Sequence, residues 1–241
     1  MGLQDALGVL YPPQCISCAA PVQSDFGLCA DCWRETPFIS GLVCDSCGVP
    51  LPGLDSGGER VQCDDCMALA RPWERGRAVM LYQDNGRRLV LALKHGDRMD
   101  LARPAAGWML RAAQPILRPG MLAVPVPLHW LRLFRRRFNQ AALLSRGLAR
   151  AAGLEHCPDA LQRARSTGSQ DGKTRDARFA NLVGAFVVPK SRVARVAERD
   201  ILLVDDVMTS GATFAAATEA LFAAGARSVS VLGLARVAKD G

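Results

Sequence analysis

Eight of the nine cysteines in this chain occur in four Cys-x-x-Cys pairs, and thiolates at that spacing can bind a metal or undergo redox chemistry. Two such pairs present four thiolates to one tetrahedral Zn²⁺, a closed structural site with no position left for catalysis. Redox-active pairs are the alternative, but four of them in a segment without a βαβ pattern would be unusual, so zinc is favoured. The predicted ligands are Cys15, Cys18, Cys29, Cys32, Cys44, Cys47, Cys63 and Cys66.

How the four pairs share metal is open from the sequence, and one or two ions could be held. Ten residues separate the first pair from the second, and fifteen separate the third from the fourth. Sequential ribbons would join neighbouring pairs, whereas a cross-brace would interleave them. We expect sequential ribbons. The ninth cysteine, Cys157, is expected to be a small buried or free thiol.

A second stretch with chemical potential runs from residue 201 to 213 and reads Ile-Leu-Leu-Val-Asp-Asp-Val-Met-Thr-Ser-Gly-Ala-Thr. Its apolar start predicts a strand buried on both faces, ending in Asp205 and Asp206. These carboxylates could accept hydrogen bonds from sugar hydroxyls or hold a hydrated Mg²⁺. The next residues lead into a helix and could cradle a phosphate with hydroxyl and backbone N–H donors; they are Thr209, Ser210, Gly211, Ala212 and Thr213. Paired acids before a capped helix also occur in many α/β proteins without this role.

The elements that must position these groups differ between the two parts of the chain. Residues 1–70 show no sustained periodicity, as expected where metal rather than apolar burial holds the fold. From residue 75 to 241, short apolar strands alternate with amphipathic helices, which predicts a doubly wound parallel α/β sheet after a small N-terminal module. The expected strands are 78–82, 121–126, 201–204 and 228–234, and the expected helices are 87–95, 101–113, 139–152 and 213–224.

Composition and charge narrow the class of protein. The formal net charge of +7 favours phosphate-rich partners, nucleotides or nucleic acid, although a solvated basic face is the alternative. No signal peptide is recognised, because the apolar stretch 7–11 is short and follows Asp5. No apolar run reaches the roughly 20 residues of a membrane-spanning helix. We therefore expect a cytoplasmic protein without membrane insertion.

The stretch 201–213 resembles the ribose-phosphate signature of type I phosphoribosyltransferases, through its apolar run, paired acids and Thr-Ser-Gly-Ala-Thr loop. A second segment extends the likeness: Val124, Pro125, Val126 and Pro127 follow a predicted strand and lead to Phe138-Asn-Gln. With the cysteine module, these motifs resemble the ComF family of competence-associated proteins, which join a zinc ribbon to a phosphoribosyltransferase-like domain. The resemblance covers nearly the whole chain.

The resemblance implies a type I phosphoribosyltransferase-like fold that binds 5-phosphoribosyl-1-pyrophosphate. Residues 205–213 would hold the ribose 5-phosphate, and residues 124–127 would hold the pyrophosphate together with Mg²⁺. Further family positions are matched by Lys94, by the Gly96-Asp97 segment, and by Arg163, Thr167, Gln170, Arg178 and Asn181. One departure is Arg137, which stands where the family usually has glycine.

If the domain is catalytic, Asp205 and Asp206 would lie beside an oxocarbenium-like anomeric carbon while charge develops on the departing pyrophosphate. The arginines that could stabilise that charge are Arg132, Arg136, Arg163 and Arg178. Three hypotheses stay open. The protein could be a phosphoribosyltransferase with an unknown acceptor, a non-catalytic sensor of phosphoribosyl pyrophosphate or a nucleotide, or a cytoplasmic single-stranded DNA handling protein that works with the competence machinery in natural transformation.

Overall fold

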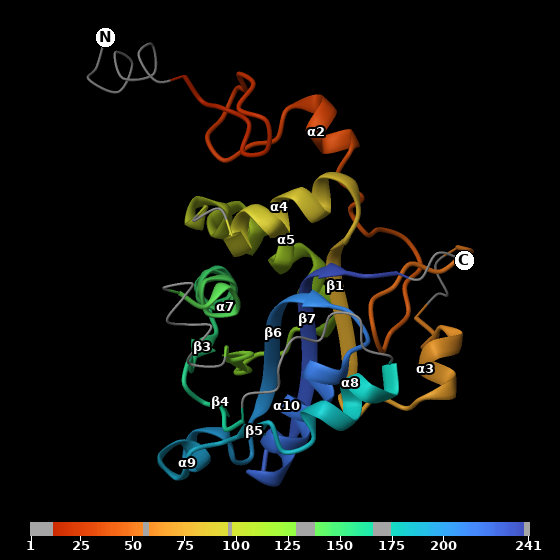
Figure 1. The fold of residues 1–241 in the computed structure, drawn as a ribbon, viewed down its shortest axis with the longest axis vertical. Helices are drawn as coiled ribbons and strands as arrows, with labels where there is room; N and C mark the ends of the chain where they lie inside the picture. Colours follow the sequence, from red (N-terminus) through yellow and green to blue (C-terminus); the bar gives the residue numbers. More distant parts are fainter. Residues whose placement is uncertain (1–11, 55–57, 96–97, 129–137, 166–174, 239–241) are drawn as a thin grey trace.

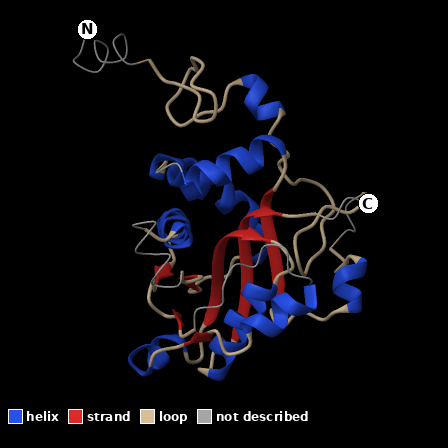
Figure 2. Ribbon diagram, in the orientation of Figure 1, coloured by secondary structure: helices blue, strands red, loops and turns tan. Residues whose placement is uncertain are grey.

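A computed structural model of the chain describes residues 12–54, 58–95, 98–128, 138–165 and 175–238. Its centre is a five-stranded parallel sheet in the order β1-β7-β6-β2-β3, and a small antiparallel pair, β4-β5, lies apart from it (Figures 1 and 2). The strands are β1 (Arg75–Leu81), β2 (Leu122–Pro125), β3 (Glu155–His156), β4 (Gln162–Arg163), β5 (Phe186–Val187), β6 (Asp200–Met208) and β7 (Ser228–Arg236).

Helices cover both faces of the sheet. The longer ones are α4 (Asp84–His95), α5 (Ala102–Ala113), α7 (Gln140–Ala152), α8 (Arg175–Leu182) and α10 (Ala212–Ala223). Shorter turns of helix are α2 (Ala30–Arg34), α3 (Asp64–Ala68) and α9 (Val193–Val196), with 3-10 turns at Met99–Leu101, Gln114–Ile116 and Lys190–Arg192. None of the described helices combines the length and apolar character needed to cross a membrane.

Strand β6 shows how the two faces form. Ile201 and Leu203 join one apolar core with residues of α8 and α10, whereas Leu202 and Val204 join a second core with residues of α4, α5 and α7. This division follows from the two-residue period of a strand. A continuous apolar run therefore suits a central strand with helices on both sides, as the sequence predicts.

The strands and helices expected from residue 75 onward are confirmed with small shifts at their ends, and so is the α/β class. Helix α7 begins after Asn139, whose side chain accepts from the N–H of Ala141 at 3.0 Å, and it ends at Gly153 with φ of 65°. One strand is longer than expected. Strand β6 continues to Met208 because β7 pairs with it throughout, so Asp205 and Asp206 lie within the strand rather than after it.

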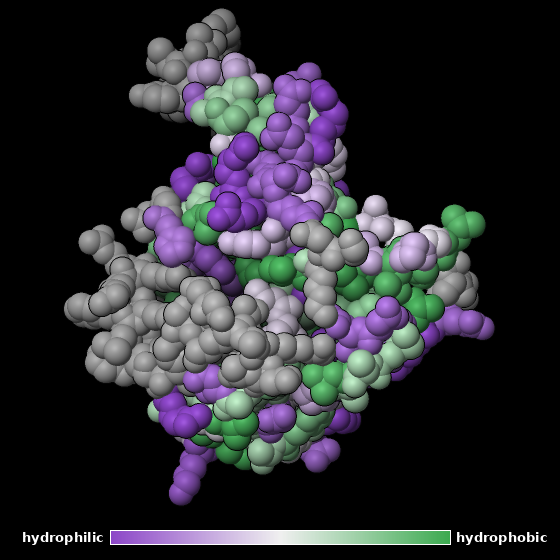
Figure 3. All heavy atoms as spheres, turned by 45° about the vertical axis from the view of Figure 1, so that its right-hand side comes forward, coloured by the Kyte–Doolittle hydropathy of each residue, from purple (hydrophilic) through white to green (hydrophobic). Residues whose placement is uncertain are grey.

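The N-terminal cysteine segment forms two ribbons in different positions. The first stands out from the body of the molecule above α4 (Figures 1 and 3). Residues 37–39 then run along the edge strand β1, where the N–H of Ile39 donates to Val79 at 2.8 Å and the N–H of Leu81 donates to Pro37 at 2.9 Å. The second ribbon lies in the core cluster that includes Phe214. The division at residues 70–75 stays a prediction, but the second ribbon shares an apolar core with the sheet.

Candidate functional site

The first cysteine cluster consists of Cys15, Cys18, Cys29 and Cys32. Their four Sγ atoms lie within 4.8 Å of one another, and the Cys18 and Cys29 Sγ atoms are 3.7 Å apart. Tetrahedral zinc with Zn–S bonds of about 2.3 Å places its sulfurs roughly 3.8 Å apart, so the arrangement fits the ion. Backbone N–H groups add support, since Cys29 donates to the Sγ of Cys15 at 3.3 Å.

The second cysteine cluster consists of Cys44, Cys47, Cys63 and Cys66, which also lie within 4.8 Å of one another. The Cys47 and Cys63 Sγ atoms are 3.7 Å apart. Hydrogen bonds from Cys44 and Cys66 lower the pKa of Cys47, while the bond with Cys44 raises the pKa of Cys66. Four thiols this close cannot all ionise unless positive charge lies between them. A bound divalent metal ion supplies that charge. The sequential pairing of ribbons is therefore confirmed, with two zinc sites of four cysteines each.

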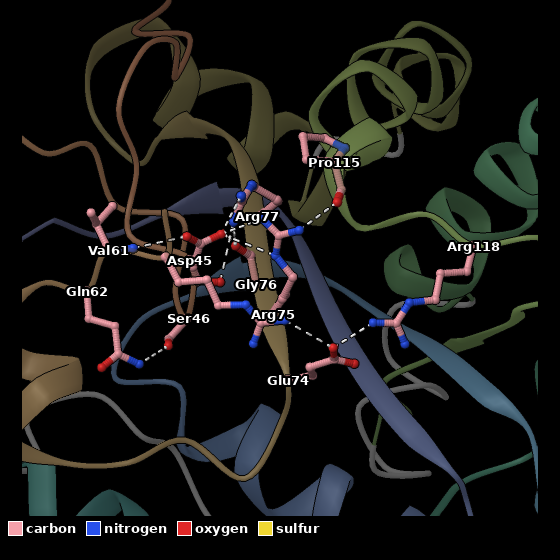
Figure 4. A network of polar contacts seen from close by, with 11 residues as sticks. Asp45, Ser46, Val61, Gln62, Glu74, Arg75, Gly76, Arg77, Pro115 and Arg118 are labelled. Atoms are coloured by element: carbon pink, nitrogen blue, oxygen red, sulfur yellow. Dashed lines mark hydrogen bonds and ion pairs between the residues drawn. The ribbon is translucent and has the colours of Figure 1, made fainter. Parts of the chain in front are cut away.

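A buried ion-pair network fastens the second ribbon to β1 (Figure 4). The Asp45 carboxylate accepts from the guanidinium of Arg75 at 2.5 Å and from that of Arg77 at 2.8 Å. Burial alone would raise the pKa of Asp45, but these hydrogen bonds hold it below its ordinary value. Glycine at two positions permits the close approach, because a Cβ on Gly76 would lie 2.5 Å from the Ser46 carbonyl oxygen and a Cβ on Gly48 would lie 2.8 Å from the Ala78 nitrogen.

The paired acids form the polar centre of the α/β domain. The Asp205 carboxylate accepts from the N–H of Asp206 at 2.8 Å, and the Lys94 ammonium lies 3.2 Å from the Asp206 carboxylate. Desolvation and the neighbouring Asp206 charge raise the pKa of Asp205 to about 8, although Lys94 and Arg163 act in the opposite direction. Such strongly shifted groups cluster at functional sites.

The residues that follow β6, Thr209–Thr213, form a loop that we call the phosphate loop after its predicted ligand. Gly211 has φ of +85° and immediately precedes α10, whose first-turn N–H groups have no carbonyl partner within the helix. The N–H of Ala212 is 3.4 Å from the Ser210 hydroxyl. The loop thus combines a left-handed glycine, hydroxyl groups and a helix N-terminus, all of which suit an anion.

The predicted pyrophosphate segment 124–127 lies beside this site, because Val124 pairs with Leu203 and Pro125 with Val204. The backbone of this segment has few N–H groups free to donate hydrogen bonds to a ligand. The N–H of Val126 already donates to the Val204 carbonyl at 2.8 Å, and Pro125 and Pro127 have no N–H. The Val124 and Val126 side chains are buried. The segment's pyrophosphate role stays a prediction, and further donors would have to come from elsewhere.

The predicted arginines are described to different extents. Arg163 lies on β4, with its guanidinium 5.4 Å from the centre of the Phe186 ring, and its charge acts on Asp205. Arg178 lies on α8, but its side chain is outside the described residues, as are Arg132, Arg136 and Arg137. Thr167, Gln170 and the Gly96-Asp97 segment are also outside them, while Asn181 lies on α8.

Three residues beside the phosphate loop were not singled out from the sequence. A Cβ on Gly211 would lie 3.0 Å from Trp73 and 3.2 Å from the Arg71 guanidinium. Arg71 donates to the Ser210 carbonyl at 2.9 Å, and Arg236 donates to the Met208 carbonyl at 3.2 Å. Arg71 and Trp73 follow the last cysteine pair closely in the sequence, but they belong to no motif. Only their contacts in the structure reveal that they lie against the loop.

Comparison with known proteins agrees with this arrangement. Residues 6–67 match the model of the double zinc ribbon domain. The DNA utilization protein YhgH of Salmonella typhi is 31% identical over 231 residues, which are 93% of this chain and 97% of that protein. The chain belongs to the ComF family. Competence protein F of Haemophilus influenzae is 28% identical to this ComF-family chain over 229 residues, 92% of this chain and 96% of that protein.

Among solved structures, the chain is similar to the glutamine phosphoribosylpyrophosphate amidotransferase of B. subtilis complexed with ADP and GMP. That likeness has a TM-score of 0.41 and 20% identity, and it covers 60% of this chain and 30% of that one. The expected α/β class, a parallel sheet with N-terminal zinc ribbons, is confirmed for this ComF-family protein by the sheet topology, the two cysteine clusters and the double zinc ribbon match.

Proposed function

We propose that this ComF-family protein binds 5-phosphoribosyl-1-pyrophosphate, or another ribose 5-phosphate compound, at the carboxyl end of β6 and transfers the phosphoribosyl group to an acceptor. One observation carries the proposal: Asp205 and Asp206 stand on β6 directly before a loop with a left-handed glycine and a helix N-terminus. Ligands of open parallel sheets bind at such strand ends. The 5-phosphate suits the N–H groups that begin α10, and the ribose hydroxyls can donate to the two carboxylates.

The donor set also suits Mg²⁺ bound with the pyrophosphate, because adjacent carboxylates are hard oxygen ligands. The bound ion would supply positive charge to the departing pyrophosphate oxygens. Asp205, whose pKa lies near 8 without ligand, would ionise when positive charge arrives beside it. Binding should therefore release a proton, which calorimetry in buffers of different ionisation enthalpy can detect.

In the transfer step, the bond between ribose C1 and the pyrophosphate oxygen breaks, and the acceptor bonds to C1 as it loses a proton to solvent. Asp205 and Asp206 stabilise the positive charge that develops at C1. Arg163, whose charge acts on Asp205, would bind the negative charge of the leaving group. Stabilisation of the leaving group by Arg136 and Arg178 stays a prediction. The same holds for pyrophosphate binding by segment 124–127.

Calorimetric titration of the zinc-loaded protein with phosphoribosyl pyrophosphate and Mg²⁺ tests the binding claim. We expect saturable binding by the wild type and its loss in the Asp205→Asn plus Asp206→Asn variant. Asp200→Asn is the matched control, because Asp200 starts the same strand and pairs with Arg227 at the opposite end. Absence of binding by folded wild type, or equal binding by the double variant, would contradict the proposal.

Release of pyrophosphate in the presence of candidate acceptors separates a transferase from a sensor. A transferase releases pyrophosphate when the acceptor is added, whereas a sensor binds the ligand without turnover. The unknown acceptor makes this a survey of bases and other nucleophiles. The double aspartate variant serves as the blank for spontaneous hydrolysis of the ligand.

A second candidate function is the handling of single-stranded DNA, and the names of the relatives favour it. The net charge of +7 would assist contacts with the phosphate backbone. Measured affinity for single-stranded DNA should then fall steeply with salt, whereas a slope near zero on a log-log plot would exclude a backbone-binding role. A cytoplasmic location, as expected from the sequence, stays part of this proposal.

A further inference from the structure

The carbonyl groups that lead into the phosphate loop are held by two arginines. Arg236 donates to the carbonyls of Met208 and Thr209, and Arg71 donates to the carbonyl of Ser210 at 2.9 Å. Three consecutive carbonyls are therefore bonded by guanidinium groups. Because the N–H and C=O groups of a peptide unit point in opposite directions, fixing these carbonyls also fixes the direction of the loop N–H groups that follow.

Arg71 also contacts the second cysteine cluster, since its Nε lies 3.4 Å from the Cys66 Sγ. Four thiolates around one zinc ion leave a net charge of about −2, which is costly to bury without cations nearby. The Arg71 guanidinium can offset part of that charge and bind the loop at the same time.

A second contact between cluster and loop runs through Trp73. Its Nε1–H donates to the carbonyl of Ser46, which lies between Cys44 and Cys47, at 2.5 Å. Its ring meets the position that a Cβ on Gly211 would occupy, at 3.0 Å, and packs at 6.1 Å from the Phe214 ring on α10. The Arg71 guanidinium lies 5.6 Å from the Trp73 ring centre, so the two side chains form one layer between cluster and loop.

We propose that Arg71 is a positioning residue that transmits the geometry of the second zinc cluster to the phosphate loop, and that this contact sets the loop's affinity for a 5-phosphate. The proposal rests on the proposed function, since it assigns a ligand to the same loop. It gives the second ribbon a part in ligand binding beyond holding the fold. Arg71 touches the Ser210 carbonyl rather than the ligand and acts through the loop backbone.

The test compares Arg71→Met with a control arginine on the same ribbon. Met keeps much of the side-chain length but cannot donate. Arg60→Met is the control, because Arg60 is exposed and pairs with Glu74 at 3.5 Å, away from the loop. Both variants should keep two zinc ions per chain and the wild-type melting temperature within a few degrees.

Hydrogen exchange of the phosphate-loop amides is measured without ligand, and ribose 5-phosphate binding is measured by calorimetry. In Arg71→Met we expect loop exchange to become at least about tenfold faster and affinity for ribose 5-phosphate to fall about tenfold or more. Arg60→Met should match the wild type in both. Unchanged loop exchange in Arg71→Met, with zinc retained, would overturn the proposal.

The Arg71→Lys variant distinguishes the effect of the positive charge from the effect of contacting Cys66 and Ser210 with one side chain. A lysine ammonium keeps the positive charge near Cys66 but lacks the fixed fork that reaches Cys66 and Ser210 together. We expect most of the affinity loss to persist, and wild-type affinity in this variant would overturn the bridging role. If wild type itself binds no ribose 5-phosphate, the proposed function fails together with the affinity claim, while loop exchange still decides whether Arg71 positions the loop.

Discussion

The two cysteine clusters have the same ligands and nearly the same compactness, yet they are placed in different surroundings. In the first cluster Cys18 is exposed, and the ribbon stands away from the sheet (Figure 1). In the second, Cys44 and Cys47 are fully buried and share a core with Phe214 of α10. Ile16 of the first ribbon joins the core on the opposite face of the sheet, whereas three cysteines of the second ribbon lie inside the core beside Phe214. One motif therefore lies at the periphery in one place and forms a wall of the α/β domain in the other.

The contacts of each ribbon explain this difference. The first is held by Ile16, which is buried with residues of α4, and by hydrogen bonds of Asn85, which donates to the carbonyl of Cys32 at 3.1 Å and to the Thr36 hydroxyl at 2.9 Å. The second is held to β1 by buried ion pairs of Asp45 and to the phosphate loop by Arg71. Removing the first ribbon's metal should leave the sheet intact, whereas removing the second's should not.

The largest expected effect comes from replacing a zinc ligand in each cluster. Cys47→Ser should lower the unfolding temperature of the whole α/β domain by many degrees, because structural zinc contributes on the order of 10 kcal/mol of folding free energy in small zinc domains. Cys18→Ser should leave the main calorimetric transition nearly unchanged. Each variant should contain one zinc ion by elemental analysis. Equal losses of stability would show that the ribbons are equivalent.

The next largest effect concerns Asp45. Asp45→Ala leaves Arg75 and Arg77 without their buried carboxylate, and breaking one side of such a pair costs about 3–5 kcal/mol. Asp31→Ala in the first ribbon is the control, since the Asp31–Arg34 pair is exposed and should be worth less than about 1 kcal/mol. Urea unfolding of the two variants measures both losses of unfolding free energy. A loss below about 1 kcal/mol for Asp45→Ala would mean that the network does not fasten the second ribbon.

Much of this arrangement could be predicted from the sequence, because local signals agreed with the fold. The cysteine spacing indicated the ligands, and the apolar run before Asp205 indicated a central strand with a phosphate loop after it. The docking of the second ribbon could not be predicted, since the spacing of Cys-x-x-Cys pairs carries no information on what they pack against. Arg71 and Arg236 reach the loop through tertiary contacts over 139 and 28 residues of sequence, which no local pattern records.

The pH dependence of stability sharpens the comparison further. The pKa of Asp205 is raised from 3.8 to about 8, so the folded state binds a proton that the unfolded state releases. Stability should fall as pH rises from about 4 to 8, and Asp205→Asn should remove that loss, a gain on the order of a few kcal/mol at pH 8 to 9. Urea denaturation of the wild type and Asp205→Asn between pH 5 and 9 measures the difference in unfolding free energy. A gain that does not grow with pH would contradict the assignment.

The same variant distinguishes the ribbons by hydrogen exchange. Residues 42–66 should gain protection with Asp205→Asn at high pH, because the second ribbon shares the core of the domain. Residues 12–36 should gain less, because we expect the first ribbon to open before the sheet does. Equal gains in both would mean that they unfold as one unit.

The smallest effect concerns the attachment of the first ribbon. Asn85 is fully buried, and Asn85→Ala should cost about 1–3 kcal/mol through the loss of its two donated hydrogen bonds, although the Thr36 hydroxyl still donates to the Cys32 carbonyl at 2.6 Å. Exchange should rise in residues 12–36 while residues 200–236 stay protected. Ser17→Ala is a milder control, because it removes one hydrogen bond to Asn85 and leaves the other two. A loss of protection throughout the sheet would show that the first ribbon is also part of the domain.

The central claim is that a ribose 5-phosphate ligand binds the phosphate loop beside the second zinc cluster. Hydrogen exchange of the full zinc-loaded chain, with and without phosphoribosyl pyrophosphate and Mg²⁺, tests it most directly. We predict added protection in residues 204–215 and in the second ribbon near Arg71, with no change in residues 12–36. Protection confined to the first ribbon, or no change at 204–215 under saturating ligand, would contradict the account.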